Sequence, residues 1–186
     1  LYISSDSGKT FVNKHTFPEK ISKILVKPDD ISNITIATGG SFNSPEKIYK
    51  STDGGEHFVE VFSNYYWLTT MQKSFDYSPY NSEIILLACH NGNGILRSTN
   101  DGNTWNFTNN GLYGISYVSL VQGYNNTGFY ITSYEGGKFY KCSNYKDIIE
   151  QKFLYGWWSN RQLATTSSEP NDIWLVNDYG TFLSTD

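Results

Sequence analysis

The sequence has 186 residues, of which 38% are hydrophobic and 17% charged, a composition that supports a buried core and argues against disorder. The formal net charge is −4, so the chain lacks the basic surface that binds nucleic-acid phosphates, and we expect no nucleic-acid partner. No apolar run approaches the roughly 20 residues that a membrane-spanning helix needs, so we expect no membrane span in this segment.

One eight-residue string occurs three times along the chain, with a constant spacing of 47 residues. The copies read Ser-Ser-Asp-Ser-Gly-Lys-Thr-Phe at 4–11, Ser-Thr-Asp-Gly-Gly-Glu-His-Phe at 51–58 and Ser-Thr-Asn-Asp-Gly-Asn-Thr-Trp at 98–105. A short strand-like lead precedes each copy. Two weaker copies follow similar leads, one starting at Cys142 and one at Ser184.

The string has the chemistry of a tight turn. Ser and Asp side chains bond backbone amides within such a turn, Gly adopts positive φ, and the terminal aromatic packs back onto the sheet. We therefore predict a structural role, and neither catalysis nor calcium binding, for the repeated residues: Ser4, Asp6, Gly8, Ser51, Asp53, Gly55, Ser98, Asn100, Gly102, Ser184 and Asp186.

Two further strand-like runs precede each lead, as at 21–27 and 34–38. Together with the lead and with the strand that follows the string, they give four antiparallel strands in each repeat, here called A to D. Four strands repeated every 40 to 50 residues predict an all-β fold, a β-propeller of four-stranded blades. A solenoid is the alternative, but no helix pattern recurs in each repeat. Only 145–153 reads as a possible helical turn.

The repeats divide the chain into about four blade-equivalents, with the strings on the hairpins between strands C and D. We predict a partial blade at 1–14, blades at about 19–62, 67–109 and 115–154, and a partial blade at 161–186. A closed four-bladed ring would duplicate strand C at its seam, so an excerpt of a larger propeller is the favoured interpretation.

Aromatic residues make up 17% of the chain and recur in the connections from strand D to the next strand A. Exposed aromatic rings with polar neighbours suit the flat faces of sugars. The candidate substrate-binding residues are Tyr65, Tyr66, Trp67, Tyr113, Trp157 and Trp158. In the alternative interpretation the tryptophans fill the wedges between blades. Trp105 and Trp174 are predicted to be core residues.

Other polar residues are interpreted as follows. Glu135 is the candidate catalytic acid or base, with a solvated loop carboxylate as the alternative, and Asp76, Asp178 and His90 rank below it. The charged pairs Glu19-Lys20 and Glu46-Lys47 read as ordinary loop charge. Two cysteines and three histidines lack metal-ligand spacing, so we predict neither a metal nor a cofactor.

Glycosylation sequons begin at Asn33, Asn106 and Asn125. The chain is so rich in Asn, Ser and Thr that chance alone accounts for this number of sequons. The sequons by themselves therefore do not indicate that the protein is secreted.

The repeated string resembles the Asp-box, or BNR repeat, of sialidases, xyloglucan hydrolases and sortilin-type receptors. Sialidases of this type use three arginines to bind the sugar carboxylate, whereas this chain has only Arg97 and Arg161. The segment 169–186 resembles a strand and Asp-box of the xyloglucan hydrolases, and 134–139 resembles their catalytic loop, with Tyr134 in place of the Asp. The segment 77–82 is similar to sortilin-type propellers.

These resemblances imply a secreted or luminal propeller that binds or hydrolyses polysaccharide. The alternative that they imply is a non-catalytic propeller that recognises a protein or peptide. The two differ in that a glycosidase needs two carboxylates across its cleft.

Overall fold

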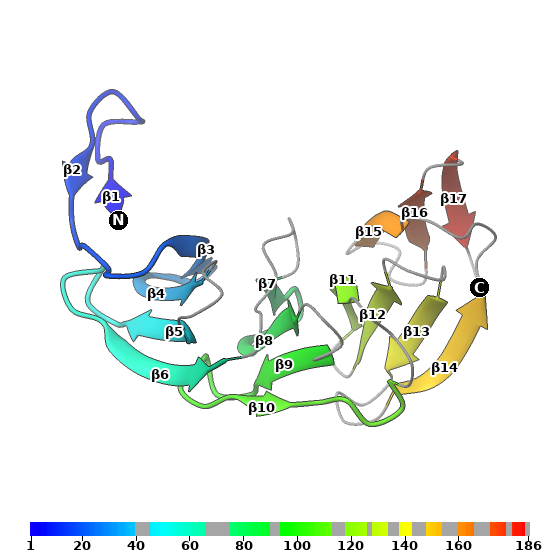
Figure 1. The fold of residues 1–186 in the computed structure, drawn as a ribbon. Coiled ribbons are helices and arrows are strands. Elements are labelled where there is room, and N and C mark those ends of the chain that lie inside the picture. Colours follow the sequence, from blue (N-terminus) through cyan, green and yellow to red (C-terminus); the bar gives the residue numbers. More distant parts are fainter. Residues whose placement is uncertain are drawn as a thin grey trace. The chain divides into compact units, whose positions relative to one another are not determined.

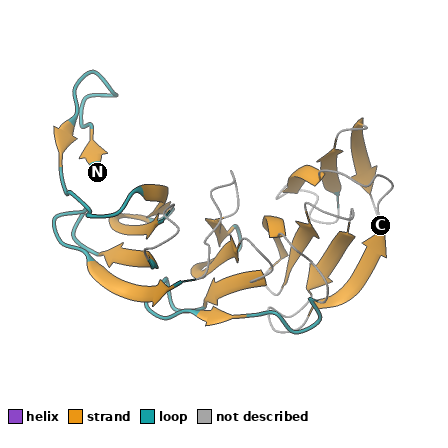
Figure 2. Cartoon of the chain, viewed as in Figure 1, coloured by secondary structure: helices purple, strands orange, loops and turns teal. Residues whose placement is uncertain are grey.

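The computed structural model describes residues 1–39, 45–65, 75–89, 94–112, 118–125, 128–133, 138–142, 148–153, 160–165, 172–177 and 180–184. Every regular element within these ranges is a β-strand, as Figure 1 and Figure 2 show. The chain divides into two compact units, Leu1–Tyr65 and Tyr66–Asp186, which are described separately.

The first unit contains a hairpin and one four-stranded sheet. In the hairpin, β1 (Tyr2–Ile3) pairs with β2 (Val12–Asn13). The sheet has the order β3 (Ile21–Lys27), β4 (Asp30–Thr38), β5 (Glu46–Ser51) and β6 (Val59–Asn64), and every neighbouring pair is antiparallel.

The second unit contains three sheets whose strands also pair in chain order. The first runs through β7 (Phe75–Ser78), β8 (Asn81–Cys89), β9 (Gly94–Ser98) and β10 (Asn106–Phe107). The second runs through β11 (Val118–Asn125), β12 (Gly128–Ser133), β13 (Lys138–Cys142) and β14 (Ile148–Phe153). The third has three strands, β15 (Asn160–Thr165), β16 (Ile173–Asn177) and β17 (Gly180–Ser184).

These sheets confirm the prediction of an all-β fold made of four-stranded antiparallel sheets. The alternative of a helical turn at 145–153 is wrong for Ile148–Phe153, because this segment is the strand β14 and pairs with β13. Each meander of four strands joined by short connections is the arrangement of a propeller blade.

The core of the second unit lies between its sheets. On β8, Ile84 to Cys89 are all buried, which fits a continuous apolar run in a strand covered on both faces. One side of this sheet packs onto β12 and β13 in a cluster made of Ile84, Leu86, Ala88, Ile95, Phe129, Ile131, Tyr140 and Cys142. The opposite face of β12 and β13 packs Tyr130 and Phe139 against Leu163, Ile173 and Leu175.

The two predicted core tryptophans have different surroundings. Trp105 is buried, and its ring centroid lies 6.1 Å from that of Phe75, so the prediction is confirmed. Trp174 is 42% exposed, so the prediction is wrong for this residue. Side chains alternate along a strand, and its neighbours Ile173 and Leu175 take the face that packs onto the preceding sheet. Trp174 therefore lies on the opposite face.

Candidate functional site

Successive loops of each antiparallel sheet emerge at opposite edges. In the first unit, the turn β5–β6 carries the repeated string and lies at the same end of the strands as the turn β3–β4. We call this end of the sheet the turn edge. The opposite end of the strands, which we call the connection edge, holds three segments: the connection β4–β5, the residues that follow β6, and the residues that lead into β3. The candidate sugar-binding residues belong to connections of the second kind.

Tyr65 is the one candidate substrate-binding residue that falls within the described ranges. It follows Asn64, the last residue of β6, and its side chain is 74% exposed. The others lie outside the described residues: Tyr66, Trp67, Tyr113, Trp157 and Trp158, and with them the candidate catalytic Glu135. His90 and Asp178 are likewise outside, whereas Asp76 lies exposed on β7.

The first connection, 14–20, shows that aromatic residues in connections also serve as packing. Phe17 lies between Tyr49 and Phe58, with ring centroids 5.1 and 5.0 Å away, and His15 adds a third ring at 4.6 Å. Phe58 is the terminal aromatic of the second repeated string. Phe17 thus fixes the connection to the sheet, in contrast to the exposed ring of Tyr65.

A charged cluster beside this connection was not expected from the sequence. Lys47 Nζ lies 3.1 Å from Glu19 Oε1 and 3.2 Å from Glu60 Oε2, and the Tyr49 hydroxyl donates to Glu19 Oε2 at 3.2 Å. The carboxylate of Glu19, followed by that of Glu60, raises the pKa of Lys47. Both carboxylates contact the same ammonium group, so this cluster links the connection at Glu19 to the sheet strands that carry Lys47 and Glu60.

The interpretation of Glu19 and of the Glu46-Lys47 pair as ordinary loop charge is therefore wrong. Glu46 is buried at 6% exposure, and Lys47 is paired twice. The missed signal was the spacing on β5, because Lys47 and Tyr49 are two residues apart and share one face of the strand.

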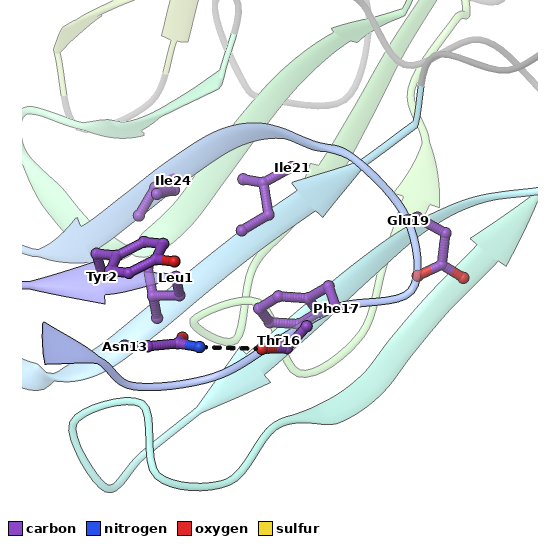
Figure 3. Close-up of a pocket in the computed structure, with 8 residues that line it drawn as sticks. All are labelled: Leu1, Tyr2, Asn13, Thr16, Phe17, Glu19, Ile21 and Ile24. Atoms are coloured by element: carbon purple, nitrogen blue, oxygen red, sulfur yellow. Dashed lines mark hydrogen bonds between the residues drawn. The ribbon is translucent and has the colours of Figure 1, made fainter.

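A pocket of about 470 Å³ lies between the β1–β2 hairpin and β3, as Figure 3 shows. Its walls combine apolar side chains with few polar ones: Leu1, Tyr2, Asn13, Thr16, Phe17, Glu19, Ile21 and Ile24. The Asn13 amide donates to the Thr16 hydroxyl at 3.2 Å, and Glu19 is held by Lys47. The side chains of Asn13, Thr16 and Glu19 are thus bonded within the protein.

The three strong copies of the repeated string form one hydrogen-bond pattern. In the second copy Ser51 Oγ accepts the Gly55 amide at 2.9 Å, and Asp53 Oδ1 accepts the amides of Glu56 and His57 at 3.0 Å each. The Gly amide bonds the Ser hydroxyl at 2.8 Å in both other copies, from Gly8 to Ser4 and from Gly102 to Ser98.

Two consecutive residues of each turn have positive φ. The first of the two is Ser7 at 62°, Gly54 at 74° and Asp101 at 55°, and the second is always the repeated glycine. The same turn position also bonds the start of the central strand: Gly54 donates to the Ser32 carbonyl and Asp101 to the Glu83 carbonyl, each at 2.8 Å. Every acceptor atom named here bonds a group of the protein itself, so the repeated string forms a hydrogen-bonded turn.

The turn lowers the pKa of its acid. The pKa of Asp6 falls to about 2, chiefly through hydrogen bonds from Thr10, and the pKa of Asp53 falls to about 2, chiefly through the His57 amide. In the third copy Asn100 occupies this place, and its Oδ1 accepts the Thr104 amide at 2.9 Å without a titrating group.

We predict that acid weakens the hydrogen bonds to Asp6 and Asp53 in the first two turns but not the equivalent bonds to Asn100 in the third. The third turn also holds Asp101, a buried carboxylate whose Oδ1 accepts the Tyr77 hydroxyl at 3.1 Å, so the contrast concerns this one position of the string. A lowered folded-state pKa contributes stability above the unfolded value of about 4 and loses it as the pH falls toward 2. Carboxyl titration by NMR, with amide hydrogen exchange of Gly55 and Gly102 between pH 4 and pH 2, measures this. The variant Asp53→Asn, which copies Asn100, should remove the acid sensitivity of the second turn. Ordinary titration of Asp53 near pH 4 would contradict the prediction.

The described part of the chain lacks a metal-binding cluster and a membrane-spanning helix. No group of three or more His, Cys, Asp or Glu side chains there is arranged to hold a metal ion. None of the described residues forms a helix long and apolar enough to cross a membrane.

Solved structures similar to this chain are β-propellers. YCF48 bound to D1 peptide matches 100% of this chain at 16% identity, with a TM-score of 0.69 over 57% of its own length. A GH74 enzyme from Niastella koreensis matches 86% at 20% identity, with a TM-score of 0.61. A GH74 xyloglucanase from Xanthomonas campestris matches 83% at 16% identity, also with a TM-score of 0.61.

These likenesses agree with the sheets in showing the fold. The chain is a segment of a β-propeller, with about four blade-equivalents, as predicted. It spans 26% of the length of each of these two GH74 enzymes and 57% of YCF48. No protein-family model and no curated protein matches the sequence.

Proposed function

We propose that this chain is part of a secreted or luminal Asp-box propeller that binds polysaccharide of the xyloglucan or β-glucan type at its connection edge. The observation that carries the proposal is the 74% exposure of Tyr65 directly after β6, at the start of Tyr65-Tyr66-Trp67. A large ring presented to solvent, with Asn64 beside it, has the amphipathic chemistry that sugar faces require.

The contrast between two connections supports this proposal. The ring of Phe17 packs against three aromatic neighbours, namely Tyr49 on β5, Phe58 just before β6, and His15 in its own connection. Tyr65 leaves its sheet with most of its surface in water. The fold of the GH74 enzymes adds a fold-level analogy for the choice of sugar.

Hydrolysis is the stronger form of the proposal and assigns the role of catalytic acid or base to Glu135. Cleavage of a glycosidic bond uses two carboxylates roughly 5 to 10 Å apart. Glu19 and Glu60 are unsuited to this role, because both are bound to the Lys47 ammonium. Loss of product with retained binding in Glu135→Gln would support hydrolysis, whereas release of product at the unchanged rate would exclude Glu135.

The binding proposal predicts that Tyr65→Ala weakens the affinity for xyloglucan oligosaccharides about two- to tenfold, because one ring contact contributes about 0.5–1.5 kcal/mol. The double variant Trp157→Ala/Trp158→Ala should weaken it at least as much without a large fall in melting temperature. Isothermal titration of the full chain measures both. Phe11→Ala, which removes a 63% exposed ring at the end of the first repeated string in the β1–β2 hairpin, should leave the affinity unchanged.

Unchanged affinity in both Tyr65→Ala and the tryptophan double variant would overturn the binding proposal, and so would collapse of the fold in the tryptophan double variant. The latter result would assign those rings to packing between blades.

The second candidate function is recognition of a protein or peptide, as in a sortilin-like receptor. The observation that favours it is the match to the peptide-bound YCF48 structure over the whole chain. Titration with a set of peptides beside the oligosaccharides separates the two functions, because heat from peptides alone supports the receptor.

A further inference from the structure

Burial distinguishes two of the three sequon asparagines, Asn33 and Asn106, although the number of sequons carried no information. Asn33 lies inside β4 at 6% exposure, and Thr35, the third residue of its sequon, is fully buried. Asn106 lies on β10 with its side chain exposed. Asn125 ends β11, and the threonine of its sequon lies outside the described residues.

The position of Asn106 in its sheet leaves room for a large substituent. β10 is the edge strand in the order β10-β9-β8-β7, so among the described strands only β9 pairs with it. Asn106 pairs with Arg97, and the next bond along the edge runs from the Thr108 amide to the Ile95 carbonyl at 2.8 Å. A group attached to the exposed Asn106 amide therefore extends into solvent without displacing a strand.

The position of Asn33 does not allow this. β4 is an inner strand, flanked by β3 and β5, and its residues Asn33 to Thr38 are all buried. At 6% exposure the Asn33 side chain has no open surface on which a glycan could be attached without displacing the atoms that bury it. The two sequons therefore differ in what the folded chain tolerates.

We propose that Asn106 is an N-glycan acceptor when this chain passes through a secretory compartment, and that Asn33 carries no glycan in the folded protein. The physiological relevance rests on the secreted or luminal location in the proposed function. The co-substrate is an oligosaccharide linked to a lipid diphosphate, and the acceptor sequence is Asn106-Phe107-Thr108.

The transfer balances without any redox partner. A bond forms between Asn106 Nδ2 and C1 of the first sugar while the bond between C1 and the diphosphate oxygen breaks. The electron pair of the broken bond leaves with the lipid diphosphate, and the amide nitrogen gives up one proton to the transferase. The primary amide of the side chain becomes a secondary amide, and its carbonyl group is unchanged.

The glycan would also protect the sheet. An edge strand presents unpaired backbone groups that favour association with other chains, and Phe107 beside the acceptor is 38% exposed. A sugar chain on Asn106 covers this edge. Loss of the glycan in Asn106→Gln is thus expected to increase association of the secreted chain on size-exclusion chromatography.

The test uses the full chain with an added secretion signal, expressed in eukaryotic cells. The secreted protein is digested and its sequon peptides are analysed by mass spectrometry, with and without an amidase that removes N-glycans. We expect a glycan on Asn106, no glycan on Asn33, and loss of the glycan in Asn106→Gln. Asn103→Gln, which changes an exposed asparagine outside any sequon, should leave the glycan in place.

A bare Asn106 in the secreted chain, or a glycan on Asn33 in secreted and folded chain, overturns the proposal. A glycan found on Asn125 alone has the same effect. If the chain is retained in cells, the same peptide map of the retained protein decides, because acceptor use is read by mass. Oligosaccharide titration of the deglycosylated protein is a separate measurement, so failure of the polysaccharide proposal is distinguishable from failure of this one.

Discussion

Replacing Leu86 by alanine is expected to lower the free energy of unfolding by about 2–5 kcal/mol. Leu86 lies on β8 at 3% exposure, in the cluster that joins this sheet to Phe129, Ile131 and Tyr140 of the next one. The truncation removes apolar contacts and leaves a cavity, because neighbouring strands held by hydrogen bonds relax only in part. Urea unfolding of the full chain, followed by tryptophan fluorescence and circular dichroism, measures the loss.

Trp174→Ala is the matched comparison for this variant. Leu86 pairs with Arg97 and Trp174 pairs with Leu183, and each partner directly precedes the serine of a repeated string. The two residues therefore occupy the same place in their blades, but Trp174 is 42% exposed. We expect a smaller loss for Trp174→Ala than for Leu86→Ala, although a larger side chain is removed. Equal losses would contradict the assignment of the core.

This comparison also shows which part of the fold was predictable. The alternation of side chains and the spacing of the strings indicate strands and their grouping, because pairing within a blade is local and the turn chemistry is explicit. Whether a strand residue is buried depends on the sheet packed against it. Ile173 and Trp174 have similar apolar character in the sequence, yet one is 7% exposed and the other 42%.

The candidate site was less predictable for a physical reason. The turns follow from residues within eight positions, and Asn100 is recognisable as a replacement for Asp because both side chains offer an Oδ1 acceptor. The ion pair between Glu19 and Lys47 joins groups far apart in sequence, so the two charges attract each other only once the chain has folded. Phe17 and Tyr65 are both aromatic residues of connections, and nothing in their local sequence separates the packed ring from the exposed one.

Ser98→Ala is expected to cost about 1–3 kcal/mol. Ser98 is 1% exposed, and its hydroxyl accepts the amides of Gly102 at 2.8 Å and Asn100 at 3.3 Å while it donates to Asn100 Oδ1 at 3.0 Å. Alanine leaves the Gly102 amide buried and without its acceptor. Because water cannot replace the lost oxygen at this depth, the cost approaches the full desolvation penalty of the amide.

Ser4→Ala removes the same atom from the same turn in a different environment. Its Oγ accepts the Gly8 amide at 2.8 Å, but this bond is exposed, so water can take the place of the hydroxyl. We expect Ser4→Ala to cost clearly less than Ser98→Ala in urea unfolding, with faster exchange of the Gly102 amide only in the latter. If both substitutions cost the same, burial of the amide would not be the cause, and the turn would owe its stability to the left-handed backbone at Gly8 and Gly102 instead.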